Sequence, residues 1–297
     1  MQMTGTGVAL VTPFHRFSVD YEGLGRLIDH VIAGGIEYVV SLGTTGETAT
    51  LTATEQLAVL DYTLERVAGR CGVVAGFGGN NTAKLCEEVR NYHFDGVTAI
   101  LSASPAYNKP TQEGIYRHYL ALAEAAPRPI ILYNVPARTA CNMTAETTLR
   151  LAAHGTSAFL GIKEASGNLA QVMALTKHAP ANFLVISGDD NLTLPMLALG
   201  ARGLISVSAN AYPHEVTRLV NAALAGEYAT ARKLHFALQD LTDLLFAEGN
   251  PAGIKAALSH IGICSPDVRL PLVAASEKLQ LAIAAEAHKS LLANVLV

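Results

Sequence analysis

The chain has 297 residues, half of them hydrophobic and only 15% charged, with a formal net charge of −4. The length suits a single α/β barrel or two smaller domains around a large core. The negative charge argues against binding to nucleic acid or an anionic membrane, and no apolar run reaches the roughly 18 residues of a spanning helix. No basic segment precedes an apolar one at the start, so we expect no secretory signal and a cytoplasmic protein.

The cysteines and histidines are not spaced as metal ligands. The four cysteines are scattered, and the ten histidines form no His-x-x-x-His pair with an acidic partner. A chain in the cytosol keeps its thiols reduced. We therefore expect neither a disulfide, nor a metal site, nor a cofactor.

Short apolar segments alternate with helical patterns along the first 225 residues. The predicted strands cover residues 8–11, 38–42, 73–76, 97–101, 130–133, 159–163, 184–187 and 204–207. Each is followed by a predicted helix, at residues 20–33, 53–68, 82–92, 112–125, 145–154, 168–178, 191–199 and 214–224. Capping residues mark several helix starts, among them Asp20, Thr144 and the capping-box sequence Thr52–Glu55.

This alternation predicts a closed (β/α)₈ TIM barrel over residues 1–225. The strands are rich in Val, Ile and Leu, as strands covered on both faces should be. An open doubly wound sheet is the alternative, but it would need a Gly-x-Gly-x-x-Gly turn after the first strand, and none is present. After Gly226 three helical patterns follow without strands, at residues 228–247, 251–261 and 276–292, and predict a C-terminal helical domain over residues 226–297 that packs on the barrel.

Lys163 ends the sixth predicted strand, and no charge precedes it there. The ordinary interpretation is a lysine that extends its ammonium to a polar rim. The functional one is an amine in an apolar pocket, where burial would lower its pKa from about 10.4 and expose a nucleophilic lone pair. Lys255 is the rival, but it lies on a predicted C-terminal helix away from the barrel mouth and is expected to be structural.

Polar residues follow several other strands, at the end of a barrel where chemistry gathers. Thr44 and Thr45, flanked by glycines, could hold a carboxylate or form an ordinary turn. Tyr107 lies in a loop that two prolines stiffen. Tyr133 can donate or accept a proton, and Arg138 carries a planar guanidinium group that suits a carboxylate. Each alone could be a surface or core residue. An amine, phenols, hydroxyls and a guanidinium without metal ligands together suit Schiff-base chemistry on a small carboxylate substrate.

These motifs resemble the dihydrodipicolinate synthase (4-hydroxy-tetrahydrodipicolinate synthase) family, within the pyruvate-dependent class I aldolase/lyase superfamily. The resemblance covers essentially the whole chain and rests on Gly43–Glu47, the Tyr107 loop, Tyr133–Thr139, Gly161–Glu164, Ser187–Asp190 and Asn250–Pro251. Arg138 after Asn-Val-Pro favours the synthase, because sialic-acid lyase relatives usually lack it.

The resemblance implies a condensation of pyruvate with L-aspartate 4-semialdehyde to 4-hydroxy-tetrahydrodipicolinate, the first committed step of lysine biosynthesis through diaminopimelate. Lys163 would form an imine with pyruvate. Tyr133 would be the general acid and base, in a proton relay with Thr44 and with a Tyr107 that reaches across from a neighbouring chain.

The resemblance also assigns the substrate contacts and the assembly. Thr44 and Thr45 would hold the pyruvate carboxylate, and Arg138 would bind the carboxylate of the semialdehyde. Gly188 and the Ile205 carbonyl would line the pyruvate pocket. The dimer would be the smallest active unit, within a homotetramer built as a dimer of dimers.

The chain departs from the lysine-inhibited members of the family. They carry two histidines, a glutamate and a tyrosine where this chain has Ala53, Gln56, Lys84 and Ala106, whereas Asn80 and Ala49 remain. A cation at Lys84 would repel the α-amino group of lysine, so we predict weak or absent feedback inhibition. Ala106 also removes an aromatic ring from the expected dimer interface.

Two other functions fit parts of the pattern. A sister aldolase acting on a 2-keto-3-deoxy sugar acid would share the lysine and the tyrosine, and Arg138 is the discriminating residue. A catalytically idle barrel that binds small carboxylates as a sensor or scaffold is the third hypothesis.

Overall fold

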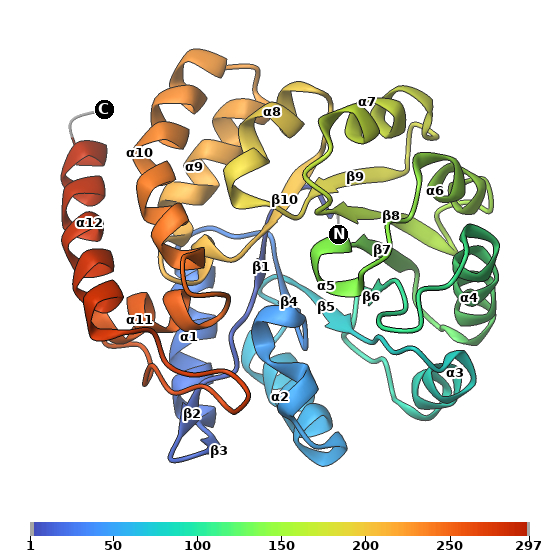
Figure 1. Cartoon of the computed structure of the whole chain (residues 1–297), viewed down its shortest axis with the longest axis horizontal. Helices are drawn as coiled ribbons and strands as arrows, with labels where there is room; N and C mark the ends of the chain where they lie inside the picture. The colour runs from blue at the N-terminus through green and yellow to red at the C-terminus, as the bar shows by residue number, and fades with distance from the viewer. Residues whose placement is uncertain (1–2, 296–297) are drawn as a thin grey trace.

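The computed structural model describes residues 3–295, with side chains up to residue 289, and confirms the predicted barrel. Eight parallel strands close in the spatial order β1-β10-β9-β8-β7-β6-β5-β4 (Figure 1). They are β1 Gly5–Ala9, β4 Tyr38–Ser41, β5 Gly72–Gly76, β6 Ala99–Ala103, β7 Ile130–Asn134, β8 Phe159–Glu164, β9 Leu184–Ser187 and β10 Gly203–Ser206. A small hairpin that the sequence did not predict, β2 Phe14–His15 and β3 Ser18–Val19, follows β1.

Helices connect consecutive barrel strands, and local capping explains where they begin. Asp20 accepts the N–H of Gly23 at the start of α1, and Thr52 and Glu55 form the predicted capping box of α2. The helices are α1 Tyr21–Ala33, α2 Ala53–Val67, α3 Thr82–Asn91, α4 Gln112–Ala125, α5 Pro136–Thr139, α6 Ala145–Ala152, α7 Leu169–His178, α8 Thr193–Ala198 and α9 Pro213–Leu224. The short α5, directly after β7, was not predicted.

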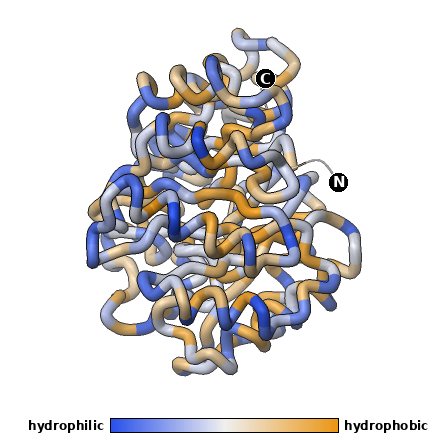
Figure 2. Tube along the Cα trace, turned by 90° about the vertical axis from the view of Figure 1, so that its right-hand side faces the viewer, coloured by the Kyte–Doolittle hydropathy of each residue, from blue (hydrophilic) through white to orange (hydrophobic). Residues whose placement is uncertain are grey.

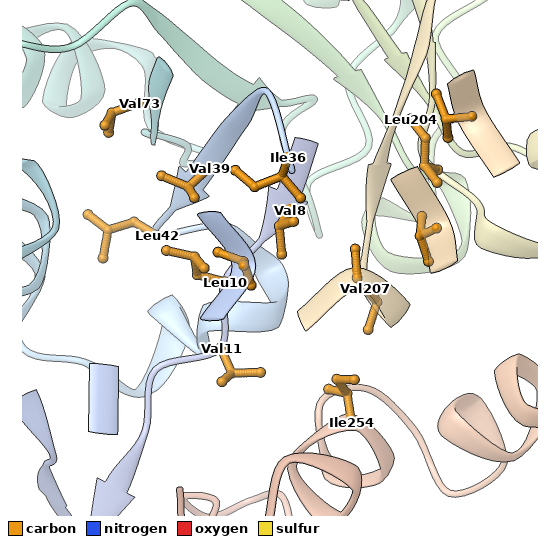
Figure 3. Packing of buried hydrophobic residues seen from close by; sticks show 14 of the residues in the cluster. Val8, Leu10, Val11, Ile36, Val39, Leu42, Val73, Leu204, Val207 and Ile254 are labelled. Atoms are coloured by element: carbon orange, nitrogen blue, oxygen red, sulfur yellow. The ribbon is translucent and has the colours of Figure 1, made fainter. Parts of the chain in front are cut away.

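Alternation along the strands divides the buried side chains into two groups. Inward-facing residues such as Tyr38, Ile131 and Ile186 form one cluster inside the barrel. Outward-facing residues pack against the helices in a second and larger cluster, part of which Figure 3 shows. Figure 2 shows the resulting distribution, with hydrophobic segments inside and hydrophilic ones on the outer turns. The site is therefore built on a rigid, apolar frame.

Three helices follow the barrel, as predicted: α10 Tyr228–Phe246, α11 Ala252–His260 and α12 Glu277–Val295. They lie together beside α1 and α9 (Figure 1). Ile254 of α11 belongs to the same apolar cluster as Val11 and Val207 of the barrel (Figure 3). A domain boundary near residue 225 stays a prediction. None of the helices within residues 3–295 is long and apolar enough to cross a membrane.

Candidate active site

Lys163 and Tyr133 lie side by side inside the barrel. Lys163 on β8 pairs in register with Tyr133 on β7 and with Ile186 on β9. Its ammonium nitrogen is 4.5 Å from the centroid of the Tyr133 ring, and the two residues are only 5% and 7% exposed. Among residues 3–289 no carboxylate lies within ion-pair distance of Lys163. The buried position disfavours a lysine that reaches a solvated rim.

Gly188 and Ile205 complete the wall around the lysine stem. A Cβ on Gly188 would lie 2.8 Å from the Cβ of Ala165 and 3.0 Å from both Cγ and Cε of Lys163. The Gly188 N–H donates to the Glu164 carbonyl at 2.8 Å, which fixes this close approach. Ile205 on β10 is buried with the other inward-facing residues. The structure thus brings Lys163, Tyr133, Gly188 and Ile205 together.

The loop after β4 holds the two threonines in different environments. Residues Thr44–Gly46 form a 3₁₀ turn in which Thr45 is buried and Thr44 is exposed. The Thr45 hydroxyl accepts a hydrogen bond of 2.9 Å from Nδ2 of Asn250. Sequence reasoning did not assign Asn250 a place in the site, because it lies 205 positions from Thr45.

Tyr107 and Arg138 lie on exposed segments that follow β6 and β7. Tyr107 is 89% exposed and has a left-handed backbone with φ of +73°, which is uncommon and strained for a bulky residue. Arg138 lies in α5 and is exposed. Their assignment to a relay and to substrate binding stays a prediction.

A buried polar network supports the outer side of β7 and β8, and sequence reasoning missed it. The Glu164 carboxylate accepts bonds from the Ser166 N–H at 2.7 Å, from Asn134 Nδ2 at 3.1 Å and from Gln171 Nε2 at 2.9 Å. Oδ1 of Asn134 accepts the N–H of Met143 at 2.9 Å. Because Asn134 follows Tyr133 and Glu164 follows Lys163, the network fixes the strand ends that carry the site. The signal available in the sequence was a polar residue directly after each of the two site residues, at the end of an apolar strand.

Lys255 is closer to the site than the sequence predicted. Its side chain is fully buried, and its ammonium donates to Glu47, in the loop after β4, at 2.5 Å. It also lies 4.1 Å from the Phe14 ring centroid. Burial lowers the pKa of Lys255, and the Glu47 carboxylate opposes that shift. The expectation of a position away from the barrel mouth was wrong, because this hydrogen bond places the Lys255 side chain against the loop that follows β4.

Within residues 3–295 no three His, Cys, Asp or Glu side chains are grouped to hold a metal ion. The feature that distinguishes the site is the buried side-chain nitrogen of Lys163, which lies beside the Tyr133 ring in a parallel barrel. Such an arrangement defines the class of barrel enzymes that activate a carbonyl substrate as a Schiff base.

Comparison with known proteins identifies the family. The model of the dihydrodipicolinate synthetase family matches residues 2–290, and the chain belongs to this family. The 4-hydroxy-tetrahydrodipicolinate synthase of Parabacteroides distasonis is 50% identical over 274 residues, which cover 92% of each chain. These matches confirm the resemblance and favour it over the sugar-acid aldolase.

Solved structures agree with this assignment. Dihydrodipicolinate synthase from Aquifex aeolicus is 40% identical, with a TM-score of 0.93 over 97% of this chain and 98% of that one. The enzyme from Cyanidioschyzon merolae, whose structure has lysine bound, is 37% identical with a TM-score of 0.93, over 97% and 99% of the two chains.

Gly188→Ala tests the close packing around Lys163. The added methyl group would overlap Ala165 and the lysine stem, so we expect the free energy of unfolding to fall by about 1–3 kcal/mol. Urea unfolding measures the change, and a crystal structure of the variant should show Lys163 displaced. Gly79→Ala is the matched control, because a Cβ there meets nothing within 4 Å. Equal stability of the two variants would contradict the packing argument.

Proposed function

We propose that the chain condenses pyruvate with L-aspartate 4-semialdehyde to form 4-hydroxy-tetrahydrodipicolinate, as a cytoplasmic enzyme of lysine biosynthesis through diaminopimelate. The observation that carries the proposal is the amine of Lys163, which is buried beside Tyr133 and has no carboxylate paired to it among the side chains that the structure describes. The names of the relatives suggest the substrates, and the geometry supports Lys163 as the nucleophile.

Lys163 starts the reaction by attacking the ketone carbon of pyruvate, and loss of water leaves a protonated imine. Thr44 and Thr45 hold the pyruvate carboxylate during this step. The Thr45 hydroxyl accepts a hydrogen bond from Asn250, so its own proton is free to donate to an anion. Gly188 and the Ile205 carbonyl line the space beside the imine.

The imine then acts as the electron sink. Loss of a proton from the methyl group gives an enamine, whose carbon attacks the aldehyde of the semialdehyde. Tyr133 donates and accepts the protons of these steps, because its ring lies next to the lysine nitrogen. The amino group of the second substrate then closes the ring by displacing Lys163, which frees the product and restores the amine.

Arg138 binds the carboxylate of the semialdehyde through its planar guanidinium. Its place supports this role: α5 directly follows the strand of Tyr133, and the side chain is exposed rather than buried in the core. The sister aldolase would bind an uncharged sugar portion at this place, which does not need a cation. Arg138 therefore favours the synthase over the sister aldolase.

Borohydride trapping tests the proposed nucleophile. Reduction in the presence of pyruvate should add one pyruvate-derived group per chain on Lys163, as read by intact mass and peptide mapping. Lys163→Ala should abolish both the adduct and turnover, whereas Lys177→Ala, at an exposed lysine of α7, should change neither. An adduct on another residue, or none, would end the proposal.

Tyr133→Phe separates imine formation from condensation. The variant keeps the ring that packs on the lysine but loses the proton donor, so we expect turnover to fall by about 10²-fold or more with the trapped adduct retained. Steady-state rates and trapping yields measure the two steps. Unchanged turnover would remove Tyr133 from the mechanism.

We propose further that Tyr107 completes the proton relay from a neighbouring chain, within a homotetramer made of two dimers. Its ring is exposed and its backbone is strained, which fits a residue held by contacts outside its own chain. Sedimentation velocity with parallel rate measurements checks this, since dilution should abolish activity when dimers separate. A fully active monomer would contradict the relay across the interface.

Weak inhibition by lysine is supported by two contacts. Gln56 donates its amide hydrogens to the carbonyls of Thr48 and Leu51, at 3.1 and 3.2 Å, and so is occupied by its own loop. Lys84 is exposed, and its side-chain nitrogen lies 3.6 Å from the carboxylate of Glu88.

Initial rates measured against increasing lysine test this expectation. We predict a dissociation constant for lysine above about 1 mM, because the positively charged side chain of Lys84 repels the α-amino group of lysine. Lys84→Ala should bind lysine more tightly than the unmodified chain if that repulsion is the cause. Half-inhibition of the unmodified chain at sub-millimolar lysine would overturn the prediction.

A further inference from the structure

The segment after the barrel reaches the loop Gly43–Glu47 through three contacts. Lys255 donates to Oε1 of Glu47 at 2.5 Å, and the backbone N–H of Arg269 donates to Oε2 of the same carboxylate at 3.0 Å. Nδ2 of Asn250 donates to the Thr45 hydroxyl at 2.9 Å. The donors lie 208, 222 and 205 positions further along the chain, so tertiary structure holds this loop in place.

Glu47 needs such support because its own backbone is strained. Its φ is +54°, in the left-handed region, and it joins the 3₁₀ turns Thr44–Gly46 and Thr48–Thr50. A residue other than glycine keeps this conformation only where its surroundings enforce it. The Glu47 side chain is fully buried, so the two donors from the C-terminal segment provide that enforcement.

Lys255 is a rigid support rather than a mobile cation. Its ammonium makes a second hydrogen bond, of 2.8 Å, to the Asp267 carbonyl, and it faces the Phe14 ring. The neighbouring residue Ile254 anchors α11 in the apolar core beside Val11 and Val207 (Figure 3). A charge-assisted hydrogen bond from a fixed helix determines where the carboxylate of Glu47 lies.

Asn250 acts on the neighbouring functional group. Because the Thr45 hydroxyl accepts from Asn250, the proton of that hydroxyl points elsewhere and remains available to a bound anion. Thr45 itself is 2% exposed, so its rotamer is restricted by its surroundings. A change at Asn250 would therefore alter the direction of the donor without touching the substrate.

We propose that Asn250 and Lys255 are positioning residues, which act through Thr45 and Glu47 to hold the loop after β4 in the conformation that binds the carboxylate of the keto acid. This inference rests on the proposed function, which identifies the keto acid as pyruvate. The helical segment after the barrel thereby influences substrate binding through this loop, without contacting the substrate itself.

Asn250→Ala and the double variant Lys255→Met with Glu47→Gln test the inference. The double variant removes both charges together, which avoids an unpaired buried carboxylate. We expect the KM for pyruvate to rise by about tenfold, the change that follows from losing about one hydrogen bond. The KM for the semialdehyde and the borohydride adduct at saturating pyruvate should stay near the values of the unmodified chain. Amide hydrogen exchange should accelerate in residues 43–50 and remain unchanged in the barrel strands.

Ser276→Ala is the matched control. Ser276 donates to Glu248 at 2.6 Å within the same C-terminal segment, and among the described residues neither side chain is hydrogen-bonded to the loop after β4. This variant should lower thermal stability without changing either KM or the exchange of residues 43–50.

Lower stability with an unchanged KM for pyruvate, in both test variants, would show a merely structural role and overturn the inference. If the unmodified chain forms no adduct with pyruvate, the proposed function fails separately. Hydrogen exchange then decides the positioning claim by itself: unchanged exchange of residues 43–50 overturns it, and faster exchange supports it.

Discussion

The proposed chemistry depends on one buried amine, Lys163, which has no carboxylate partner among residues 3–289. Removing an ammonium from water is costly unless opposite charge or hydrogen bonds replace the lost hydration. The side-chain nitrogen of Lys163 lies over the Tyr133 ring, 4.5 Å from its centroid, and such a ring offers only a weak attraction to a cation. The nitrogen therefore lies beside an aromatic ring and, within residues 3–289, makes no ion pair, which suits the nucleophile that we propose.

The contrast with Lys255 shows how the surroundings assign the two roles. Both lysines are buried, but the ammonium of Lys255 is tied to Glu47, to the Asp267 carbonyl and to the Phe14 ring. That amine is committed to holding the loop of Thr45, whereas Lys163 remains available. Around Lys163 the polar bonds lie on the other side of the strands, where Glu164 and Asn134 fix the backbone without approaching the amine. Because successive side chains point to opposite faces of a strand, the residues that support the backbone lie on the outer side of the barrel, and those proposed for the chemistry lie inside it.

The sequence predicted the features that depend on local or periodic information. The caps at Asp20 and Thr52 act over three residues, and the structure has both. Lys163 was found because a charge ends an apolar strand. Strand bounds differed from the prediction by one to three residues at several places, most at the start of β1, since pairing with neighbouring strands decides where a strand ends. The hairpin Phe14–Val19 was missed because its strands are only two residues long.

Contacts between distant parts of the chain could not be predicted in the same way. Asn134 and Glu164 are 30 positions apart, and Lys255 and Glu47 are 208 apart, so no local pattern links them. Lys255 was expected away from the site because its helix follows the barrel, but its side chain reaches Glu47 in the loop after β4. The position of such a helix is set by the packing of Ile254 and its neighbours, which only the folded chain reveals.

A crystal structure of the protein soaked with pyruvate tests the central claim most directly. The account predicts continuous electron density from the Lys163 nitrogen to the second carbon of pyruvate, with the carboxylate turned toward Thr44 and Thr45. Well-ordered pyruvate that remains unbonded to Lys163, or that is joined to Lys255 instead, would contradict it.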